Sequence, residues 1–294
     1  MAIIQKFIRR RPVLTYFVLT FAISGSGILL ALGPGGLPIT AETFETVPLL
    51  ALMASLAGPS VAGILLTALV SGRAGLRELL SRLLKWRVGI GWYAVALLAA
   101  PLLATAVPLA LSLFSREFLP AIFMTDDLAG PLLSAIIAGL LVGLFEELGW
   151  TGFATPVLRR RYSILTTGMI VGVLWGAWHF PMFWEAGSFS GALPLAILLA
   201  RLFSWLPAYR VLMVWVYDHT ESLLLAVLMH VSLTASMIIV APVTLAEVPL
   251  LTSILVGAAA WWLLVAAVML ANRGQLSRPG KPPTGIGAPQ LTPR

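Results

Sequence analysis

Eight apolar segments, each long enough to cross a lipid bilayer, constrain the fold of this chain more than any other feature. Of its 294 residues, 59% are hydrophobic and 11% are charged, whereas soluble domains average about 25% charged residues. We therefore predict an all-α, polytopic integral membrane protein with about eight transmembrane helices. Pro181 and the glycines near it make the fifth span the least regular. The predicted spans are residues 13–34, 47–71, 90–114, 130–157, 164–184, 192–216, 222–243 and 248–271.

The basic residues predict how these spans are oriented. Cytosolic segments of membrane proteins carry an excess of Lys and Arg. If both termini are cytosolic, every Lys and Arg except Arg116, Arg201 and Arg210 falls in a cytosolic segment. This distribution explains the net charge of +7 without nucleic acid as a partner. The predicted cytosolic segments are residues 1–12, 72–89, 158–163 and 217–221 and the tail from residue 273.

The segments outside the core spans have their own patterns. Arg73–Arg87 has leucines at helical spacing and basic residues on much of the remaining face, which predicts an amphipathic helix on the inner leaflet. The apolar stretch Val13–Leu32 is longer than the core of a signal peptide, so we interpret it as a retained first span. We predict a single transmembrane domain over residues 1–272, with a catalytic-like core at about 129–240. Residues 273–294 are rich in Pro and Gly and are predicted to be a disordered basic tail.

Two carboxylates and two imidazoles are predicted to lie inside the membrane. Glu146 and Glu147 fall in the fourth span, His179 in the fifth and His230 in the seventh. Such residues are costly in a bilayer and indicate function. With a helical rise of about 1.5 Å per residue, they lie at similar depths, roughly 13–25 Å from the cytosolic edge. We expect them to converge on one cavity that opens to the cytosol. The tryptophans near them are interpreted as packing residues and interface anchors: Trp150, Trp175, Trp178 and Trp184.

Carboxylates and imidazoles at one site support three kinds of chemistry. A carboxylate can take a proton from water while imidazoles orient that water or stabilise an oxyanion, which is hydrolysis by general base catalysis. Two histidines and one glutamate are also the ligand set of a catalytic zinc with an open position. A proton or ion relay in a transporter is the third. The chain has no cysteine, which excludes thiol nucleophiles and Cys-based zinc sites.

Three sequence blocks surround these residues: "EELGWTGF", "WGAWHFP" and "YDHTESLLLAVLMH". Together they resemble the CPBP family of CAAX-prenyl-protease and bacteriocin-processing intramembrane endopeptidases, also called the Abi family. The blocks occur in the family's order and on separate spans, and the resemblance covers roughly Ala129 to Val240. It implies an intramembrane endopeptidase, of glutamic or metallo type, that cleaves membrane-associated or lipidated peptides and proteins.

The resemblance also implies roles for individual residues. Glu146 is implied to be the catalytic glutamate that activates water, with Glu147 assisting or positioning it. His179 and His230 are implied to hold the water and the scissile carbonyl, and Thr234 to help at the oxyanion. This glutamate mechanism needs no cofactor, whereas a metallo-type mechanism would use zinc.

The chain departs from the family pattern at three positions. The E-E-x-x-x-R block ends at Thr151 instead of an arginine, and Trp175 stands where the F-x-x-x-H block begins with phenylalanine. Thr234 replaces the asparagine of the H-x-x-x-N block but keeps a hydroxyl donor. Trp175 and Thr151 are therefore candidate substrate-binding or charge-partner positions. The loss of a cation at Thr151 is the most consequential change.

A buried glutamate without a cation needs another partner, because an unpaired buried charge is costly. Arg201 and Arg210, both on the sixth predicted span, are the remaining intramembrane cations. We expect one of them, preferably Arg210, to neutralise Glu147. The alternative is that Arg210 extends to the inner membrane interface.

Two other function classes stay open beside the protease. A catalytically inactive membrane scaffold or immunity protein on the same fold is compatible with the altered Thr151 and Thr234 positions. A small-solute transporter would predict internal repeats, and the sequence has none that we recognise. The expected partners are membrane lipids and a peptide or lipidated protein substrate, with no nucleic acid.

Overall fold

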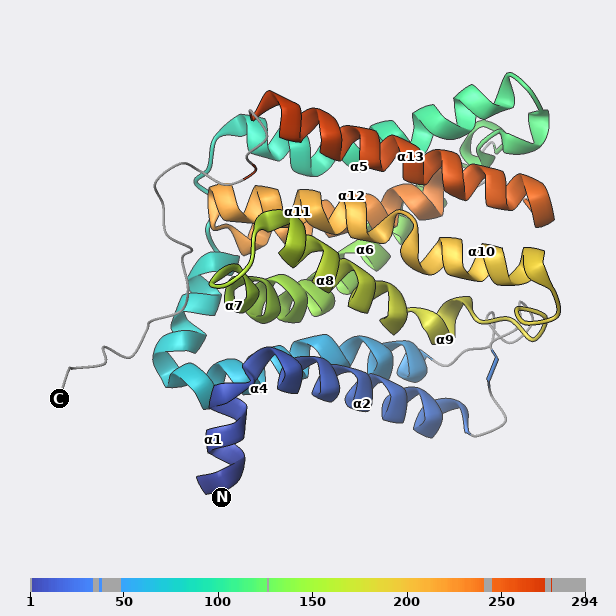
Figure 1. Cartoon of the computed structure of the whole chain (residues 1–294). Coiled ribbons are helices and arrows are strands. Elements are labelled where there is room, and N and C mark those ends of the chain that lie inside the picture. Colours follow the sequence, from blue (N-terminus) through green and yellow to red (C-terminus); the bar gives the residue numbers. More distant parts are fainter. Residues whose placement is uncertain are drawn as a thin grey trace.

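A computed structural model describes residues 2–33, 37–38, 49–125, 127–240, 245–272 and 276, and in these ranges the chain is a bundle of helices without strands (Figure 1). The predicted all-α fold is therefore confirmed. The main helices are α1 (Ala2–Arg10), α2 (Pro12–Leu32), α4 (Leu49–Leu83), α5 (Ile90–Ser112), α6 (Ala129–Gly149), α7 (Thr155–Arg159), α8 (Ile164–Trp178), α9 (Phe180–Phe183), α10 (Ala192–Phe203), α11 (Leu206–Thr220), α12 (Leu223–Val240) and α13 (Glu247–Ala271). The predicted tail, residues 273–294, lies outside the described residues apart from Leu276.

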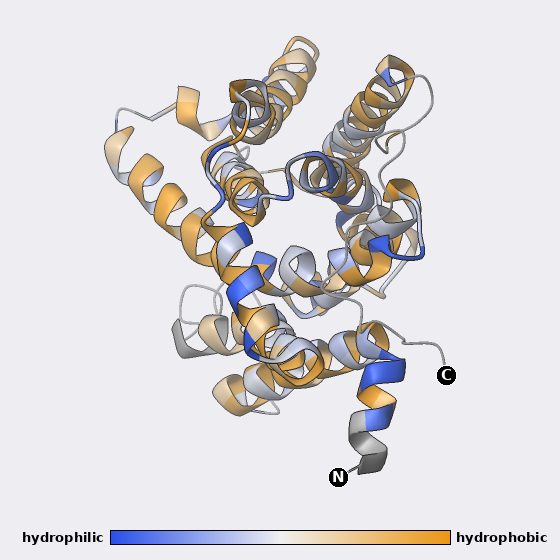
Figure 2. Ribbon diagram, turned by 90° about the vertical axis from the view of Figure 1, so that its left-hand side faces the viewer, coloured by the Kyte–Doolittle hydropathy of each residue, from blue (hydrophilic) through white to orange (hydrophobic). Residues whose placement is uncertain are grey.

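The number of membrane spans agrees closely with the prediction. In the described ranges, seven helical segments are long and apolar enough to cross a membrane, and α8 is a shorter apolar helix of 15 residues in place of the predicted fifth span. Apolar side chains such as Leu30, Leu102 and Leu263 are exposed on the helices, as expected for surfaces that face lipid. Hydrophobic residues predominate along most of the helices (Figure 2). The protein is a multi-pass integral membrane protein.

Two predicted spans are interrupted in the structure. The fifth, predicted over residues 164–184, breaks after Trp178, and the short helix α9 follows with Pro181 in its first turn. The sixth, predicted over residues 192–216, divides into α10 and α11, and Pro207 lies in the first turn of α11. The first break places His179 directly after the end of α8.

The predicted amphipathic helix forms as a continuation of α4. Gly72 has φ 61° and ψ −153°, a conformation that favours glycine, and the helix turns there before ending at Leu83 rather than at Arg87. Leu79 and Arg82 are buried against the protein, while Leu80 is 54% exposed. The helix thus packs across one end of the bundle, and its outer side carries Leu80 together with exposed Arg73, Arg77 and Ser81.

The centre of the bundle is built from α6, α8, α11 and α12. Helix α12 packs along α6, and α8 packs along α11 (Figure 1). Helices α2 and α4 form a neighbouring pair that contacts the central group through α4 and α6, and α5 and α13 lie on the other side. The four central helices lie within the part of the chain that carries the intramembrane carboxylates and histidines.

Candidate active site

The two glutamates lie at the end of α6 and are fully enclosed. Glu146 is 1% exposed and Glu147 is not exposed at all. The next residues form a π-helical turn, η3 (Trp150–Ala154), and such turns are frequent at functional sites. Gly143 brings α6 close to α12, because a methyl group there would lie 3.3 Å from Cβ of His230. The sequence therefore sets the carboxylates directly opposite a histidine.

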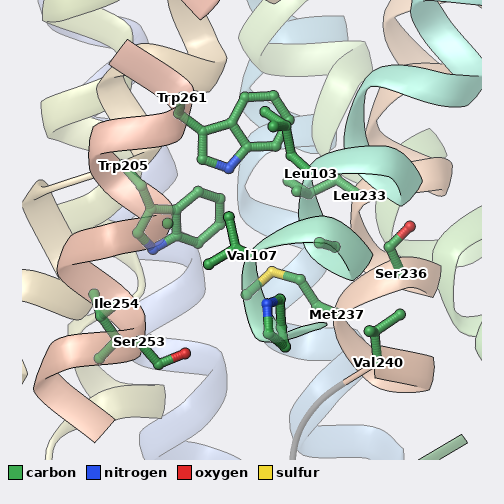
Figure 3. A pocket seen from close by; sticks show the side chains of 13 residues that line it. Leu103, Val107, Trp205, Leu233, Ser236, Met237, Val240, Ser253, Ile254 and Trp261 are labelled. Atoms are coloured by element: carbon green, nitrogen blue, oxygen red, sulfur yellow. The ribbon is translucent and has the colours of Figure 1, made fainter. Parts of the chain in front are cut away.

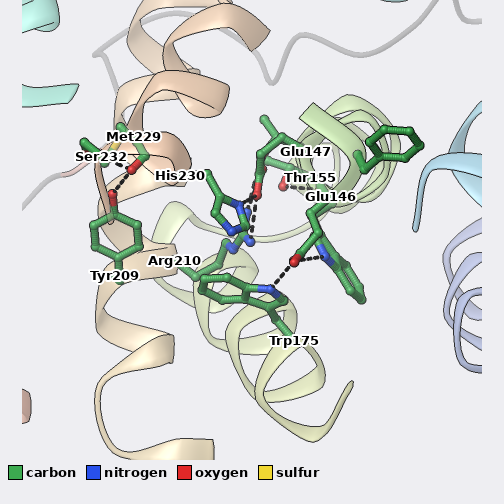
Figure 4. Close-up of polar contacts among 12 residues, drawn as sticks. Glu146, Glu147, Thr155, Trp175, Tyr209, Arg210, Met229, His230 and Ser232 are labelled. Carbon is green, nitrogen blue, oxygen red and sulfur yellow. Dashed lines mark hydrogen bonds and ion pairs between the residues drawn. The ribbon is translucent and has the colours of Figure 1, made fainter. Parts of the chain in front are cut away.

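Glu147 is held by three side chains (Figure 4). Arg210 donates from Nη1 to Oε2 at 2.8 Å and from Nη2 to Oε1 at 3.0 Å. Nδ1 of His230 lies 2.8 Å from Oε1, and the hydroxyl of Thr151 donates to Oε2. Arg210 is itself 0% exposed, so this is a buried ion pair with two parallel hydrogen bonds. Arg210 is thus the residue that pairs with Glu147, in the position expected for its neutralising partner.

Glu146 has different partners. Nε1 of Trp150 donates to Oε2 at 3.1 Å, and Nε1 of Trp175 donates to the same oxygen at 2.6 Å (Figure 4). Both indoles therefore converge on Oε2, and Oε1 receives neither hydrogen bond. These contacts were not predicted from the sequence: Trp150 was interpreted as a packing residue, and Trp175 as a packing residue or a candidate substrate-binding or charge-partner position. The available signal was the spacing of four residues between Glu146 and Trp150, which places both on one helical face.

The two histidines each present one ring nitrogen. Nδ1 of His179 lies 2.8 Å from the carbonyl oxygen of Trp175, which can only accept a hydrogen bond. Nδ1 of His179 therefore carries the proton, and Nε2 keeps its lone pair when the ring is neutral. His230 is arranged in the same way, with Nδ1 directed at the carboxylate of Glu147. His179 is half-buried, whereas His230 is 2% exposed.

Trp175 links the side chains around Glu146 to those around Glu147. Its ring lies 5.4 Å from the ring of His179 and 5.2 Å from that of His230, both in edge-to-face geometry. Cζ of Arg210 lies 4.3 Å from the centroid of the indole, a cation–π contact. Since Trp175 also donates to Glu146, one side chain contacts both carboxylate assemblies and both histidines.

Comparison with known proteins identifies the segment that carries this cluster. Residues 128–236 match the family described as type II CAAX prenyl endopeptidase Rce1-like. This match agrees with the resemblance to the CPBP family over the same part of the chain. "CAAX prenyl protease 2" from Methanococcus maripaludis is 34% identical to the chain over 76 residues. The aligned stretch covers 26% of this chain and 23% of the relative, so it spans about a quarter of the relative's length.

In the matched segment, an arginine from a different helix takes the place of the motif cation. Thr151 stands where the family block has arginine, and its hydroxyl donates to Glu147. Arg210 reaches the same carboxylate from α11, with Nη1 3.4 Å from the Thr151 hydroxyl. The small side chain at position 151 therefore leaves room for a guanidinium that enters from the neighbouring helix.

The remaining predicted residues are placed as follows. Arg201, the other candidate partner, lies elsewhere: it pairs with Glu185 at 2.7 Å, so the alternative that it neutralises Glu147 is not realised. Thr234 is half-buried one turn after His230 on α12. Tyr209, which the sequence analysis did not single out, donates its hydroxyl to the carbonyl oxygen of Met229 at 2.6 Å. This bond ties α11 to α12 beside Arg210.

The described residues do not assemble a metal site. Nowhere in the described ranges do three or more His, Asp or Glu side chains come together closely enough to hold a metal ion. Glu146, His179 and His230, the ligand set that zinc would need, are therefore not in coordinating geometry. The donor types suit zinc, but their arrangement does not.

Two cavities of the bundle lie beside the site and not around it. A cavity of about 230 Å³ lies between α5, α12 and α13 and is lined by Trp205 and Trp261 (Figure 3). A second, of about 440 Å³, lies between α2, α8, α9 and α10 and is lined by Trp178. Neither is lined by the glutamates or by His230. The predicted opening to the cytosol thus corresponds to neither cavity, because tryptophan rings fill the space around Glu146.

Proposed function

We propose that this chain is an intramembrane endopeptidase in which Glu146 activates the hydrolytic water. One observation carries the assignment: Glu147 is paired with Arg210 and His230, whereas the contacts to Glu146 among the described residues are two indole N–H groups on Oε2. A carboxylate that is neutralised by a cation is a poor proton acceptor. Glu146 keeps Oε1 available for water, and Glu147 serves as the positioning carboxylate.

The proposed reaction is the addition of water to a peptide carbonyl. A water molecule donates one hydrogen bond to Oε1 of Glu146 and a second to Nε2 of His179. As its oxygen bonds to the carbonyl carbon, one proton moves to Glu146. The proton then passes to the amide nitrogen, the C–N bond breaks, and an amine and a carboxylic acid leave.

The developing oxyanion needs hydrogen-bond donors. The hydroxyl of Thr234 lies one turn from His230 and can donate a hydrogen bond to the oxyanion. His230 donates from Nε2 when its ring carries both protons, since Nδ1 is directed at Glu147. The Glu147–Arg210 pair holds the His230 ring in the orientation that this contact requires.

The proposed substrate is a membrane-associated or lipidated peptide. The apolar cavity of about 440 Å³ lies next to Trp178, the residue before His179, and it offers space for an apolar group beside the site. The relative named CAAX prenyl protease 2 supports a prenylated peptide as the first substrate to test. We further propose that both termini are cytosolic, because the basic residues gather in the segments on that side.

Cleavage by the purified protein tests this function. We expect the wild type, reconstituted in vesicles, to cleave at least one peptide from a panel of prenylated and unprenylated sequences. His179→Ala and His230→Ala should each lose about 10²–10⁴-fold in rate, the usual range for an acid–base group. Mass spectrometry of the products measures the rate and gives the cleaved bond.

The same assay separates the alternatives. Activity that is indifferent to a chelator supports the glutamate mechanism, and loss on chelation with recovery on added zinc supports a metal-dependent one. A catalytically inactive scaffold is the second candidate function, favoured by the closed packing around Glu146 and by Thr151 and Thr234 at motif positions. Wild-type inactivity across the panel would support the scaffold.

A further inference from the structure

Helix α2 contributes a row of buried hydroxyl groups that lies outside the matched segment 128–236. Tyr16, Thr20 and Ser24 follow one another at intervals of four residues and are 0%, 0% and 3% exposed. Ser24 donates to the carbonyl oxygen of Ser55 at 2.6 Å and accepts from Nε1 of Trp178 at 2.9 Å. The hydroxyls of Tyr16 and Thr20 lie near each other, and neither makes a hydrogen bond of good geometry among the described residues.

The Tyr16 hydroxyl lies directly behind the carboxylate cluster. A methyl group on Gly149 would overlap this hydroxyl, so it lies against the backbone three residues after Glu146. The Tyr16 ring packs edge-on against Trp150, with centroids 5.6 Å apart. Trp150 is the residue whose indole donates to Glu146. Only one ring therefore separates the hydroxyl row from the proposed general base.

Two buried hydroxyls without a hydrogen bond of good geometry require an explanation. A buried polar group without a partner costs about 1–3 kcal/mol, and native proteins keep few of them. Buried water commonly satisfies such groups when several polar atoms face one spot. Ser24, at the far end of the row, lines the cavity of about 440 Å³, so the row leads from that cavity toward Glu146.

We propose that Tyr16 and Thr20 hold water behind Trp150 and supply it to Glu146. The inference rests on the proposed function and extends the site to a helix outside the matched segment. Both are positioning residues: they form no bond with the peptide, and the water they hold is the water consumed in hydrolysis. Because they contact water and not the peptide, they affect the rate of turnover rather than peptide binding.

Removing single hydroxyl groups tests the proposal. Tyr16→Phe and Thr20→Val preserve the shape of the side chains. Each should lower kcat roughly tenfold, the equivalent of one hydrogen bond, with KM unchanged. The melting temperature should stay the same or rise, since an unpartnered hydroxyl is removed. A purely structural role predicts no change in kcat, or a loss that follows the melting temperature.

Thr167→Val is the matched control. Thr167 is also fully buried with an unpartnered hydroxyl, but it lies eight residues before Trp175 on α8, about 12 Å along the helix. Its removal should leave kcat at the wild-type value. Wild-type kcat in both Tyr16→Phe and Thr20→Val would overturn the inference while leaving the protease function intact.

A second measurement tests the water site by itself, so that it can be judged even if the wild type proves inactive and the protease function is refuted. An experimental structure at a resolution that reveals ordered water should contain a water molecule bonded to Tyr16 and Thr20. The same water should be absent from Tyr16→Phe. A wild-type structure without a water molecule at Tyr16 and Thr20 would overturn the proposal.

Discussion

Replacing Arg210 with methionine should destabilise the protein by about 3–5 kcal/mol, because it leaves the buried carboxylate of Glu147 without its cation. Arg210 and Glu147 are both 0% exposed and share two hydrogen bonds, so water cannot take over from the guanidinium. The cation–π contact with Trp175 is lost as well. Thermal or denaturant unfolding of the protein in detergent measures the effect.

A double variant separates the charge from the packing. Adding Glu147→Gln to Arg210→Met removes both charges and should recover much of the lost stability, since uncharged groups of similar volume often replace a buried pair well. Arg201→Met is the control: its partner Glu185 is 65% exposed, so its loss should cost under about 1 kcal/mol. Equal destabilisation by Arg210→Met and Arg201→Met would contradict the importance of the buried pair.

Replacing Glu146 with glutamine should reduce kcat by about 10²–10⁴-fold, the usual contribution of a general base. Glutamine keeps a carbonyl oxygen that can accept from Trp150 and Trp175, so the fold should be retained. It cannot take a proton from water. Cleavage of the best peptide from the panel, measured at saturating concentration, gives the effect.

The control for this substitution makes the same chemical change elsewhere. Glu185→Gln alters an exposed carboxylate that pairs with Arg201 and contacts neither glutamate of the cluster, and it should leave kcat unchanged. If Glu146→Gln keeps more than about a tenth of the wild-type rate, Glu146 is not the general base, because a tenfold effect lies below the range of such groups.

Much of the fold could be predicted from the sequence because each apolar segment has to be long enough to cross the bilayer. Apolar stretches and the basic segments between them predict the spans and the helix after Gly72. The interruptions of α8–α9 and α10–α11 were harder to predict. Short helices inside a bundle satisfy their backbone groups through neighbouring helices, and hydropathy does not report such contacts.

The charged residues of the candidate site could be predicted, because a charge buried in an apolar environment needs a partner. Glu147 needs a cation in an apolar environment, and the scarcity of intramembrane arginines pointed to Arg210. The tryptophan contacts were not predictable in the same way. An indole is mostly apolar and packs like other apolar side chains, so a hydropathy pattern does not reveal its single N–H donor. Trp150 and Trp175 are positioned by the helix packing, which the sequence alone does not give.

The division of labour between the two glutamates is tested most directly by comparing Glu146→Gln with Glu147→Gln in the same vesicles, measuring kcat and the unfolding midpoint of each. We predict that Glu146→Gln loses kcat and keeps the midpoint. Glu147→Gln should lower the midpoint, because it leaves Arg210 buried without its counter-ion. A stable, inactive Glu147→Gln beside an active Glu146→Gln would contradict the assignment of Glu146 as the water-activating residue.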